Sequence, residues 1–337
     1  MTLPENDTTP AIIATYPEQR LKLIFNPLSG SVESSPDQLL AIVKALQAAN
    51  YLPEVFLVEP GCDVQAVVKD SLRRGHRMFV VCGGDGTIDS VAGALAGTRG
   101  TLGIVPAGTR NNVAFSLGIP DDPVAAVGLL RSGRRLKIDV GLAATDTEQR
   151  VFLEACSVGL LSALFPATDD IQHGNLARIG DLLGTLISTQ LSEMHLQVDN
   201  RAVLHTQGHI VVAANMLFIG PRFRVSADST LDDGLLDLVV YAELSKLDLL
   251  GSVISAATGG AEDVRIRHDR VRRVVVETNP PMPVILDGFP MTVTGPLRLS
   301  VRRRALNVIA APEAPATQPA QAAPPDQPTP EGDQAGA

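Results

Sequence analysis

The chain lacks tryptophan altogether, and aromatic residues make up only 4% of its 337 residues. Glycine, alanine, valine and leucine therefore supply most of the apolar content, and such small side chains suit close packing of helices on strands. Basic residues are not in excess either, because the formal net charge is −9. This balance argues against a nucleic-acid-binding protein and against attachment to anionic lipid by charge alone.

Long apolar runs are also missing. No stretch approaches about 18 consecutive apolar residues, so we expect no transmembrane helix. The N-terminus has neither the basic start nor the apolar run of a signal peptide, which favours a cytoplasmic protein. The cysteines, Cys62, Cys82 and Cys156, show no ligand spacing, and the histidines do not cluster. We therefore expect a reducing compartment and no zinc site.

The chain divides by its pattern of strand and helix signals. Over residues 20–137, apolar runs alternate with amphipathic segments, which predicts an α/β domain with a parallel sheet covered by helices on both faces. Over residues 138–300, strand-like runs dominate. One helix interrupts them, with an apolar stripe over residues 176–186. Residues 1–19 and the Pro/Ala-rich residues 311–337 are predicted to be flexible or disordered.

A glycine-rich loop is the most informative segment. The apolar run that ends at Cys82 reads as a strand, Gly83-Gly84-Asp85-Gly86-Thr87 as a loop, and residues 88–95 as a helix. Glycines let backbone N–H groups approach a phosphate, and the helix that follows presents its positive end. Asp85 would repel a phosphate unless a cation lay between them, which indicates a metal-complexed nucleotide. The alternative is a strand–turn–helix corner without a ligand.

Two further polar loops follow predicted strands in the same way. Asn26-Pro27-Leu28-Ser29-Gly30 follows residues 21–25, and Pro106-Ala107-Gly108-Thr109-Arg110-Asn111-Asn112 follows residues 101–105. The carboxyl ends of parallel strands lie at one edge of a sheet. We therefore expect the three loops to converge.

These loops resemble the nucleotide-site motifs of the diacylglycerol kinase catalytic domain family, which includes bacterial lipid kinases and the sphingosine and ceramide kinases. Residues 226–237 resemble the aspartate–glycine motif of that family, and residues 283–289 its late Asp-Gly-Glu motif. Motif order and spacing agree from about residue 20 to 310. The Gly-Gly-Asp-Gly element alone is shared with NAD kinases and phosphofructokinases.

The resemblance implies a first domain of the NAD kinase and diacylglycerol kinase type and a mostly antiparallel β second domain. The helix of the second domain would border a lipid cleft between the domains, and residues 301–310 would return to the first domain as a strand. The residues that would bind ATP are Asn26, Ser29, Gly30, Gly83, Gly84, Gly86, Thr87, Gly108, Thr109, Arg110 and Asn111.

The resemblance also assigns acidic residues. Asp85 would take part in magnesium binding or in activation of the acceptor hydroxyl, and its alternative role is to cap the helix that follows. Asp233, beside Asp232, would help to bind a structural metal, since carboxylates are the oxygen donors that Mg²⁺ and Ca²⁺ prefer. The alternative is a plain Asp-Gly turn before a strand.

Three residues depart from the family pattern. Asp287 is the expected catalytic partner of Asp85, but Phe289 stands where the family has glutamate, and phenylalanine can neither accept a proton nor bind a metal. Either Asp287 carries the role alone or the protein is catalytically impaired. Arg110 stands where many members have glycine, so it would clamp phosphate or block the base pocket. Asn112 stands where many have aspartate and brings no charge.

The motif set thus predicts a kinase that uses ATP and Mg²⁺ to phosphorylate a hydroxyl of diacylglycerol or a similar lipid. The protein would meet its substrate peripherally at a membrane surface, and a homodimer is compatible with the sequence. Two alternatives are a catalytically impaired regulator that binds nucleotide or lipid, and an NAD kinase-type enzyme. Arginines within residues 265–273 and 302–304 would form solvated strand faces or a patch for phosphate or membrane.

Overall fold

The computed structural model describes residues 18–29, 35–159, 191–199, 203–219, 223–224, 229–242, 248 and 266–312. Gly30, the helix predicted over residues 176–186 and nearly all of the two predicted tails lie outside these ranges. No helix in the described ranges is long and apolar enough to cross a membrane.

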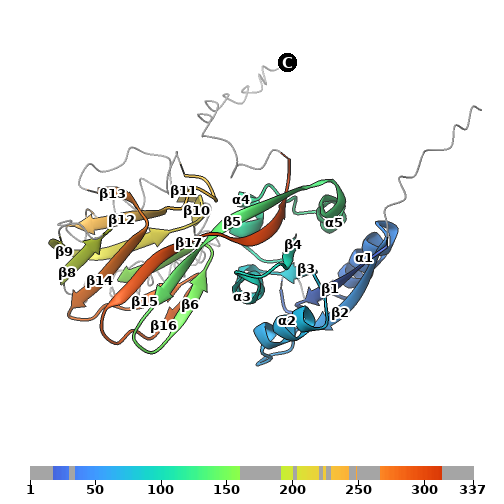
Figure 1. Ribbon diagram of the computed structural model, residues 1–337, viewed down its shortest axis with the longest axis horizontal. Coiled ribbons are helices and arrows are strands. Elements are labelled where there is room, and N and C mark those ends of the chain that lie inside the picture. Colours follow the sequence, from blue (N-terminus) through green and yellow to red (C-terminus); the bar gives the residue numbers. More distant parts are fainter. Residues whose placement is uncertain are drawn as a thin grey trace, which may run out of the picture.

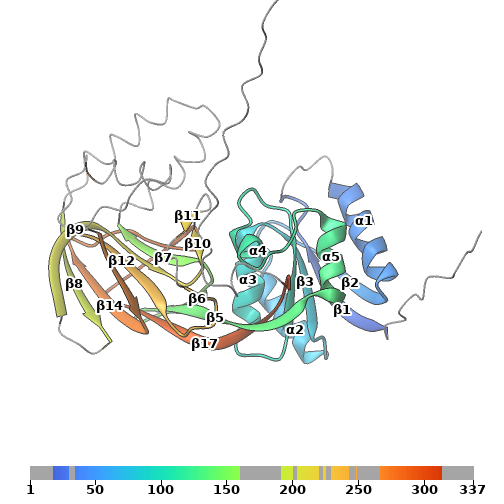
Figure 2. The ribbon, with the colours of Figure 1, turned by 90° about the horizontal axis from the view of Figure 1, so that it is seen from above.

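The N-terminal half alternates strands and helices (Figure 1). Its strands are β1 (Gln19–Phe25), β2 (Tyr51–Leu57), β3 (Met78–Gly83) and β4 (Thr101–Pro106). Its helices are α1 (Ser35–Ala48), α2 (Val64–Arg73), α3 (Asp85–Leu95), α4 (Asn112–Ser116) and α5 (Pro123–Ser132). The strands are parallel, in the order β4-β3-β1-β2. Helix α1 packs with α5 and α2 with α3, so that helices cover both faces of the sheet (Figure 2).

Local sequence explains where these elements lie. Strands β3 and β4 are buried along their whole length, because their apolar residues face helices on both sides of the sheet. Asp63 and Asp122 cap α2 and α5, each accepting a backbone N–H three residues later. Gly75 follows α2 with a φ of +97°, a conformation that glycine adopts without strain.

The C-terminal half is built of mostly antiparallel strands. They are β5 (Arg134–Ala144), β6 (Gln149–Phe152), β7 (Ala155–Gly159), β8 (Ser192–Val198), β9 (Val203–Ala214), β10 (Phe218–Ile219), β11 (Phe223–Arg224), β12 (Leu236–Ala242), β13 (Ile266–Val271), β14 (Arg273–Asn279), β15 (Val284–Leu286), β16 (Phe289–Met291) and β17 (Leu297–Ala310). The predicted fold class, an α/β domain followed by a mostly antiparallel β domain, is confirmed.

Two long strands join the halves. Strand β17 pairs antiparallel with β14 in the β-rich half and then parallel with β4, where Asn307 lies opposite Thr101. Strand β5 accompanies β17 along most of its length. Figure 1 shows β17, in red, running from one half into the other. Each half keeps its own hydrophobic core, and the loops described below lie where the halves meet.

Candidate active site

The three polar loops meet at the carboxyl edge of the parallel sheet. The side-chain amide of Asn26 donates a hydrogen bond to Thr87 Oγ1 at 2.9 Å, and Ser29 Oγ accepts one from the backbone N–H of Gly84 at 3.1 Å. A Cβ placed on Gly108 would lie 2.6 Å from Gly84 Cα, so only glycine lets these loops touch. The predicted convergence is confirmed, whereas the ATP contacts of these residues stay predictions.

The loop after β4 is braced from within. Asn111 has a φ of +51°, and its side chain both accepts from the N–H of Gly108 and donates to the carbonyl of Gly108, each at 2.9 Å. These bonds hold the turn that brings Gly108 against the glycine-rich loop. Thr109 is exposed and Arg110 is half-buried. Burial raises the pKa of both Asp85 and Glu154, and the charge of Arg110 partly opposes this effect, so its guanidinium lies near both carboxylates.

Asp85 opens α3 but does not cap it, since the cap residue is Gly84. Its carboxylate instead accepts backbone N–H groups at the start of α4, from Val113, Asn111 and Asn112. Burial outweighs these donors and raises the pKa of Asp85. Among the described residues, Asp85 Oδ1 has no hydrogen-bond partner. Asp85 therefore carries an unused acceptor atom at the point where the loops converge.

Three more carboxylates surround Asp85, and sequence reasoning missed two of them. Asp85, Asp89, Glu154 and Asp287 form a set, here called the carboxylate cluster, in which burial and the negative charges of neighbouring members raise the pKa of Asp89, Glu154 and Asp287. Asp89 lies one helical turn after Asp85, which puts both side chains on one face of α3. Sequence reasoning could have identified Asp89 from this spacing. Glu154 lies between β6 and β7, and no sequence motif marks it.

Glu154 is nearly buried, with 9% of its surface exposed. Its Oε2 accepts a hydrogen bond from the side-chain amide of Asn112 at 2.9 Å. Burial, reinforced by the charges of Asp85 and Asp287, raises the pKa of Glu154 to about 8. At neutral pH this side chain is thus mainly protonated in the folded chain.

Asp287 occupies the turn of the β15–β16 hairpin. Asp287 and Gly288 have φ values of +48° and +84°, the signature of a two-residue turn that favours Asp-Gly. The Asp287 carboxylate accepts backbone N–H groups of Leu153, Glu154 and Ala155 at 2.7–2.9 Å. Burial raises the pKa of Asp287 to about 6 against the opposing effect of these donors. Asp287 thus anchors the segment that carries Glu154.

Phe289 follows this turn and reaches the glycine-rich loop. A Cβ placed on Gly86 would lie 2.6 Å from Phe289 Cζ, so the ring rests directly on Gly86. Beside it lies a cavity of about 440 Å³ between the two halves of the molecule. Its walls are formed by Gln65, Lys69, Gly86, Asp89, Ser90, Gly93, Gln149, Arg150, Val151, Leu286, Asp287 and Phe289.

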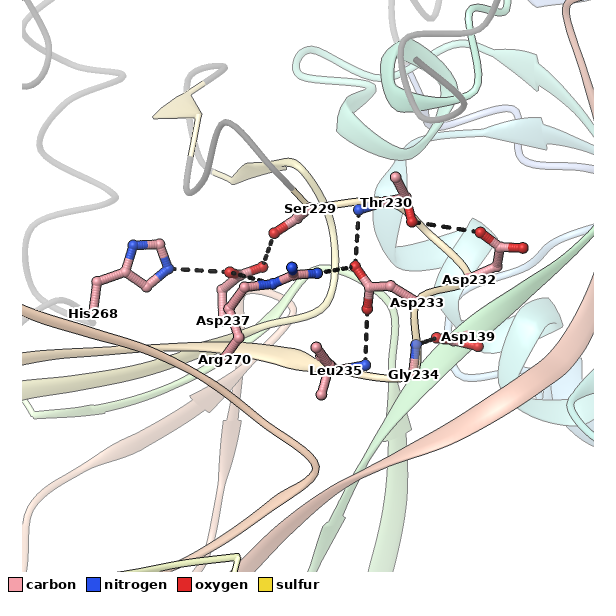
Figure 3. A network of polar contacts seen from close by, with 10 residues as sticks. All are labelled: Asp139, Ser229, Thr230, Asp232, Asp233, Gly234, Leu235, Asp237, His268 and Arg270. Carbon is pink, nitrogen blue, oxygen red and sulfur yellow. Dashed lines mark hydrogen bonds and ion pairs between the residues drawn. The ribbon is translucent and has the colours of Figure 1, made fainter. Parts of the chain in front are cut away.

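The second acidic motif has a different environment (Figure 3). Asp233 accepts backbone N–H groups of Thr230 and Leu235 at 2.9 and 2.8 Å and forms an ion pair with Arg270. Asp232 pairs with Arg304 at 3.1 Å. The two arginines neutralise the charges of Asp233 and Asp232, and the backbone N–H groups donate hydrogen bonds to Asp233.

Two more aspartates complete this set, here called the Asp233 network: Asp139, Asp232, Asp233 and Asp237 with their partners. Asp237 is buried and contacts Ser229 and His268, the latter at 3.0 Å, and Asp139 accepts the backbone N–H groups of Gly234 and Arg304, both at 2.6 Å. In the part of the chain that the structure describes, no three His, Cys, Asp or Glu residues are arranged to hold a metal ion. The predicted metal role of Asp232 and Asp233 stays a prediction.

The arginines near the C-terminus have structural contacts. Arg302 packs on Gly97 and Arg303 on Gly234, while Arg304 pairs with Asp232. Arg267 and Arg270 form ion pairs with Asp269 and Asp233. These contacts favour solvated strand faces and internal pairing over a patch that is reserved for phosphate or membrane.

Comparisons with known proteins agree with this architecture. The family model described as the diacylglycerol kinase catalytic domain matches residues 20–143, and the model described as the YegS C-terminal NAD kinase beta sandwich-like domain matches residues 168–310. A Pseudomonas aeruginosa protein named "Probable lipid kinase YegS-like" is 30% identical over 83% of this chain and 92% of its own length. The Bacillus subtilis "Diacylglycerol kinase" is 27% identical over 80% of this chain and 89% of its own length.

Solved structures share the fold. A diacylglycerol kinase from Bacillus anthracis str. Sterne superposes with a TM-score of 0.67 at 20% identity, covering 88% of this chain and 98% of that one. An Archaeoglobus fulgidus NAD kinase in complex with ATP superposes with a TM-score of 0.50 at 12% identity, covering 88% and 95%. With its two-domain fold, its converging loops and these relatives, the chain belongs to the diacylglycerol kinase catalytic domain family of bacterial lipid kinase-like proteins.

Proposed function

We propose that this chain is an ATP-dependent lipid kinase, which transfers the γ-phosphoryl group to a hydroxyl of diacylglycerol or a similar lipid. The observation that carries the proposal is the convergence of three loops at one sheet edge beside Asp85, whose Oδ1 has no partner among the described residues. Membership of a kinase family supports phosphoryl transfer, and relatives named as diacylglycerol and lipid kinases support a lipid acceptor.

The residues at the loops fit a metal-complexed nucleotide. Gly84 and Gly108 are in contact with each other, so the two loops are close enough to bind one polyphosphate through their backbone N–H groups. Bound there, ATP would supply the phosphoryl group, and Mg²⁺ would neutralise its charge. Asp85 would face the metal-complexed phosphates. Arg110, whose charge acts on Asp85, would bind phosphate oxygens, because its planar fork matches them.

Asp287 has a positioning role in this proposal. Its two oxygens accept three backbone N–H groups, which leaves it less able than Asp85 to receive a further ligand. It would hold Glu154 and the β15–β16 hairpin in place beside the nucleotide. The lipid would be met at a membrane surface, by peripheral contact.

The decisive experiment is direct. The purified protein is incubated with radiolabelled ATP, Mg²⁺ and a panel of lipids presented in mixed micelles, and we expect one new labelled phospholipid. NAD is included as a soluble acceptor. Label in NADP and in no lipid would assign the chain to the NAD kinase type instead. A protein that labels neither lipid nor NAD would contradict both activities.

A second candidate function rests on Phe289, which packs on Gly86 where the family has a glutamate. A catalytically impaired member would bind nucleotide or lipid as a regulator. Calorimetry combined with the lipid kinase assay separates the two candidates, because the regulator binds ATP–Mg²⁺ but turns over no lipid. Gain of lipid kinase activity in Phe289→Glu would favour the regulator, whereas a wild type that already phosphorylates lipid would favour the enzyme.

A further inference from the structure

Asp89 differs from the other carboxylates of the cluster in its contacts. Asp287 accepts three backbone N–H groups, Glu154 accepts from Asn112, and Asp85 accepts from the start of α4. Both oxygens of Asp89 are buried, and neither has a hydrogen-bond partner among the described residues. A buried polar group without a partner costs stability. Its presence therefore calls for a functional reason.

The surroundings of Asp89 suggest that reason. Asp89 lines the cavity of about 440 Å³ between the two halves, together with Asp287 and Phe289. The Phe289 ring packs on Gly86. This glycine lies three residues before Asp89 and therefore on the same face of α3. The ring and Asp89 thus line the same cavity. Phe289 is 50% exposed, so it can swing outward without disturbing the core.

Two cationic side chains line the same cavity as this carboxylate. Lys69 on α2 and Arg150 on β6 both line it. The guanidinium of Arg150 is held at the hairpin by a hydrogen bond from Nη1 to the carbonyl of Pro290 at 3.4 Å. Such walls would accommodate both the polar head of the acceptor lipid and the negative charge of the transferred phosphoryl group.

We propose that Asp89 is the catalytic residue that receives the proton of the acceptor hydroxyl, in the place of the glutamate that Phe289 replaces. This proposal rests on the lipid kinase function proposed above. In the step, the O–H bond of the acceptor breaks and its proton passes to the Asp89 carboxylate. The electron pair of that oxygen forms a bond to the γ-phosphorus of ATP. The bond from the γ-phosphorus to the β,γ-bridging oxygen breaks, and ADP leaves with that electron pair.

The burial of both Asp89 oxygens suits this role. Burial and the charges of Asp287, Glu154 and Asp85 raise the pKa of Asp89 well above its ordinary range. Only the ionised form of Asp89 can accept the proton. A raised pKa makes that form a stronger base but a less populated one, and this compromise is how enzymes adapt acidic residues to catalysis near neutral pH.

The test compares Asp89→Asn with Asp70→Asn in the full-length protein. Asp70 lies on the neighbouring helix α2, half-exposed and paired with Arg74, and its variant should keep wild-type kinetics. For Asp89→Asn we expect kcat on the lipid to fall at least about 100-fold, with the KM for ATP within about threefold of wild type because no nucleotide contact is lost. The melting temperature should not fall, since no hydrogen bond is removed.

Each other outcome has a distinct meaning. Unchanged kcat in Asp89→Asn, with an active wild type, overturns the role of Asp89 and leaves the kinase function standing. Lower kcat with a lower melting temperature and a raised KM for ATP identifies a structural residue and also overturns the proposal. A wild type that phosphorylates no lipid contradicts the proposed function, and the role of Asp89 fails with it. If Asp89→Asn does not fold, Asp89→Ser, which also removes the acid, gives the same comparison.

Discussion

The carboxylate cluster and the Asp233 network are both acidic, but they differ in how their charges are met. In the Asp233 network, Arg270 pairs with Asp233, Arg304 pairs with Asp232, and backbone N–H groups fill the remaining sites. In the carboxylate cluster, the only cation that acts on Asp85 within the described residues is Arg110, and Asp89 has no hydrogen-bond partner there. Carboxylates are therefore neutralised by partners in one region of the chain and left largely unneutralised in the other.

Unneutralised carboxylates mark the region where we expect chemistry. A carboxylate that is paired and hydrogen-bonded contributes to structure and has few atoms left for a ligand. Carboxylates that are buried together repel each other and take raised pKa values, which the fold tolerates mainly at functional sites. The Asp233 network thus fixes the loop before β12, and the carboxylate cluster is where we propose that nucleotide and acceptor bind.

Replacing Asp85 should have the largest effect. We expect Asp85→Asn to lower kcat at least about 100-fold, because the variant removes the charge that we propose to face the metal-complexed phosphates. The assay is transfer of label from ATP to lipid by folded protein. Asp269→Asn, which removes a partly exposed carboxylate paired with Arg267, is the matched control. Equal turnover in Asp85→Asn and wild type would place the chemistry elsewhere.

Replacing Arg270 tests whether the ion pairs of the Asp233 network stabilise the fold. Arg270→Met should cost about 2–3 kcal/mol of unfolding free energy, since it leaves the mostly buried Asp233 without its counter-ion. Arg267→Met should cost under about 0.5 kcal/mol, because its pair with Asp269 is largely exposed. Urea denaturation measures both. Similar costs for the two variants would show that the Asp233 network is no more structural than a surface pair.

Glu154 makes the stability of the folded chain depend on pH. Its pKa is about 8 in the folded chain against an ordinary value of 4.5, so the folded state holds this proton more tightly than the unfolded state. The stability that Glu154 contributes is complete below about pH 4.5 and is lost as pH rises through 8. Glu154→Gln cannot ionise and escapes this loss.

We therefore expect Glu154→Gln to gain unfolding free energy relative to wild type between pH 5 and pH 8, on the order of 3 kcal/mol. Denaturant titrations of both proteins at several pH values measure the gain. The variant should keep the bond from Asn112, because the glutamine carbonyl can accept it. Parallel stability curves would mean that Glu154 ionises normally, and the carboxylate cluster would then be less strained than its burial indicates.

Sequence reasoning predicted those features of the two acidic sets that depend on local patterns. Glycine and proline after apolar runs predicted the loops, and the parallel order of the strands made their convergence a consequence of topology. Asp85 was found because it lies inside such a loop. The same reasoning could have reached Asp89, since the two aspartates are four residues apart on one helix.

The rest depended on contacts between distant segments. Glu154 enters the cluster because the Asp287 carboxylate, 133 residues later, accepts its backbone N–H. Asp233 has hard oxygen donors that suggest a metal, but strand pairing between β12 and β13 brings Arg270 to it. The sequence showed that Phe289 replaces an acid, yet it could not show that the ring packs on Gly86.

That last contact gives the smallest predicted effect and the finest test of how the two halves meet. Alanine is favoured over glycine in a helix by up to about 1 kcal/mol, but a Cβ at Gly86 would lie 2.6 Å from Phe289 Cζ. We expect Gly86→Ala to be neutral or destabilising by under about 1 kcal/mol, because the half-exposed ring must shift. In the Phe289→Ala background the same change should become stabilising. This reversal of sign in a double-mutant cycle would demonstrate the contact, whereas additive effects would mean that the ring leaves Gly86 in solution.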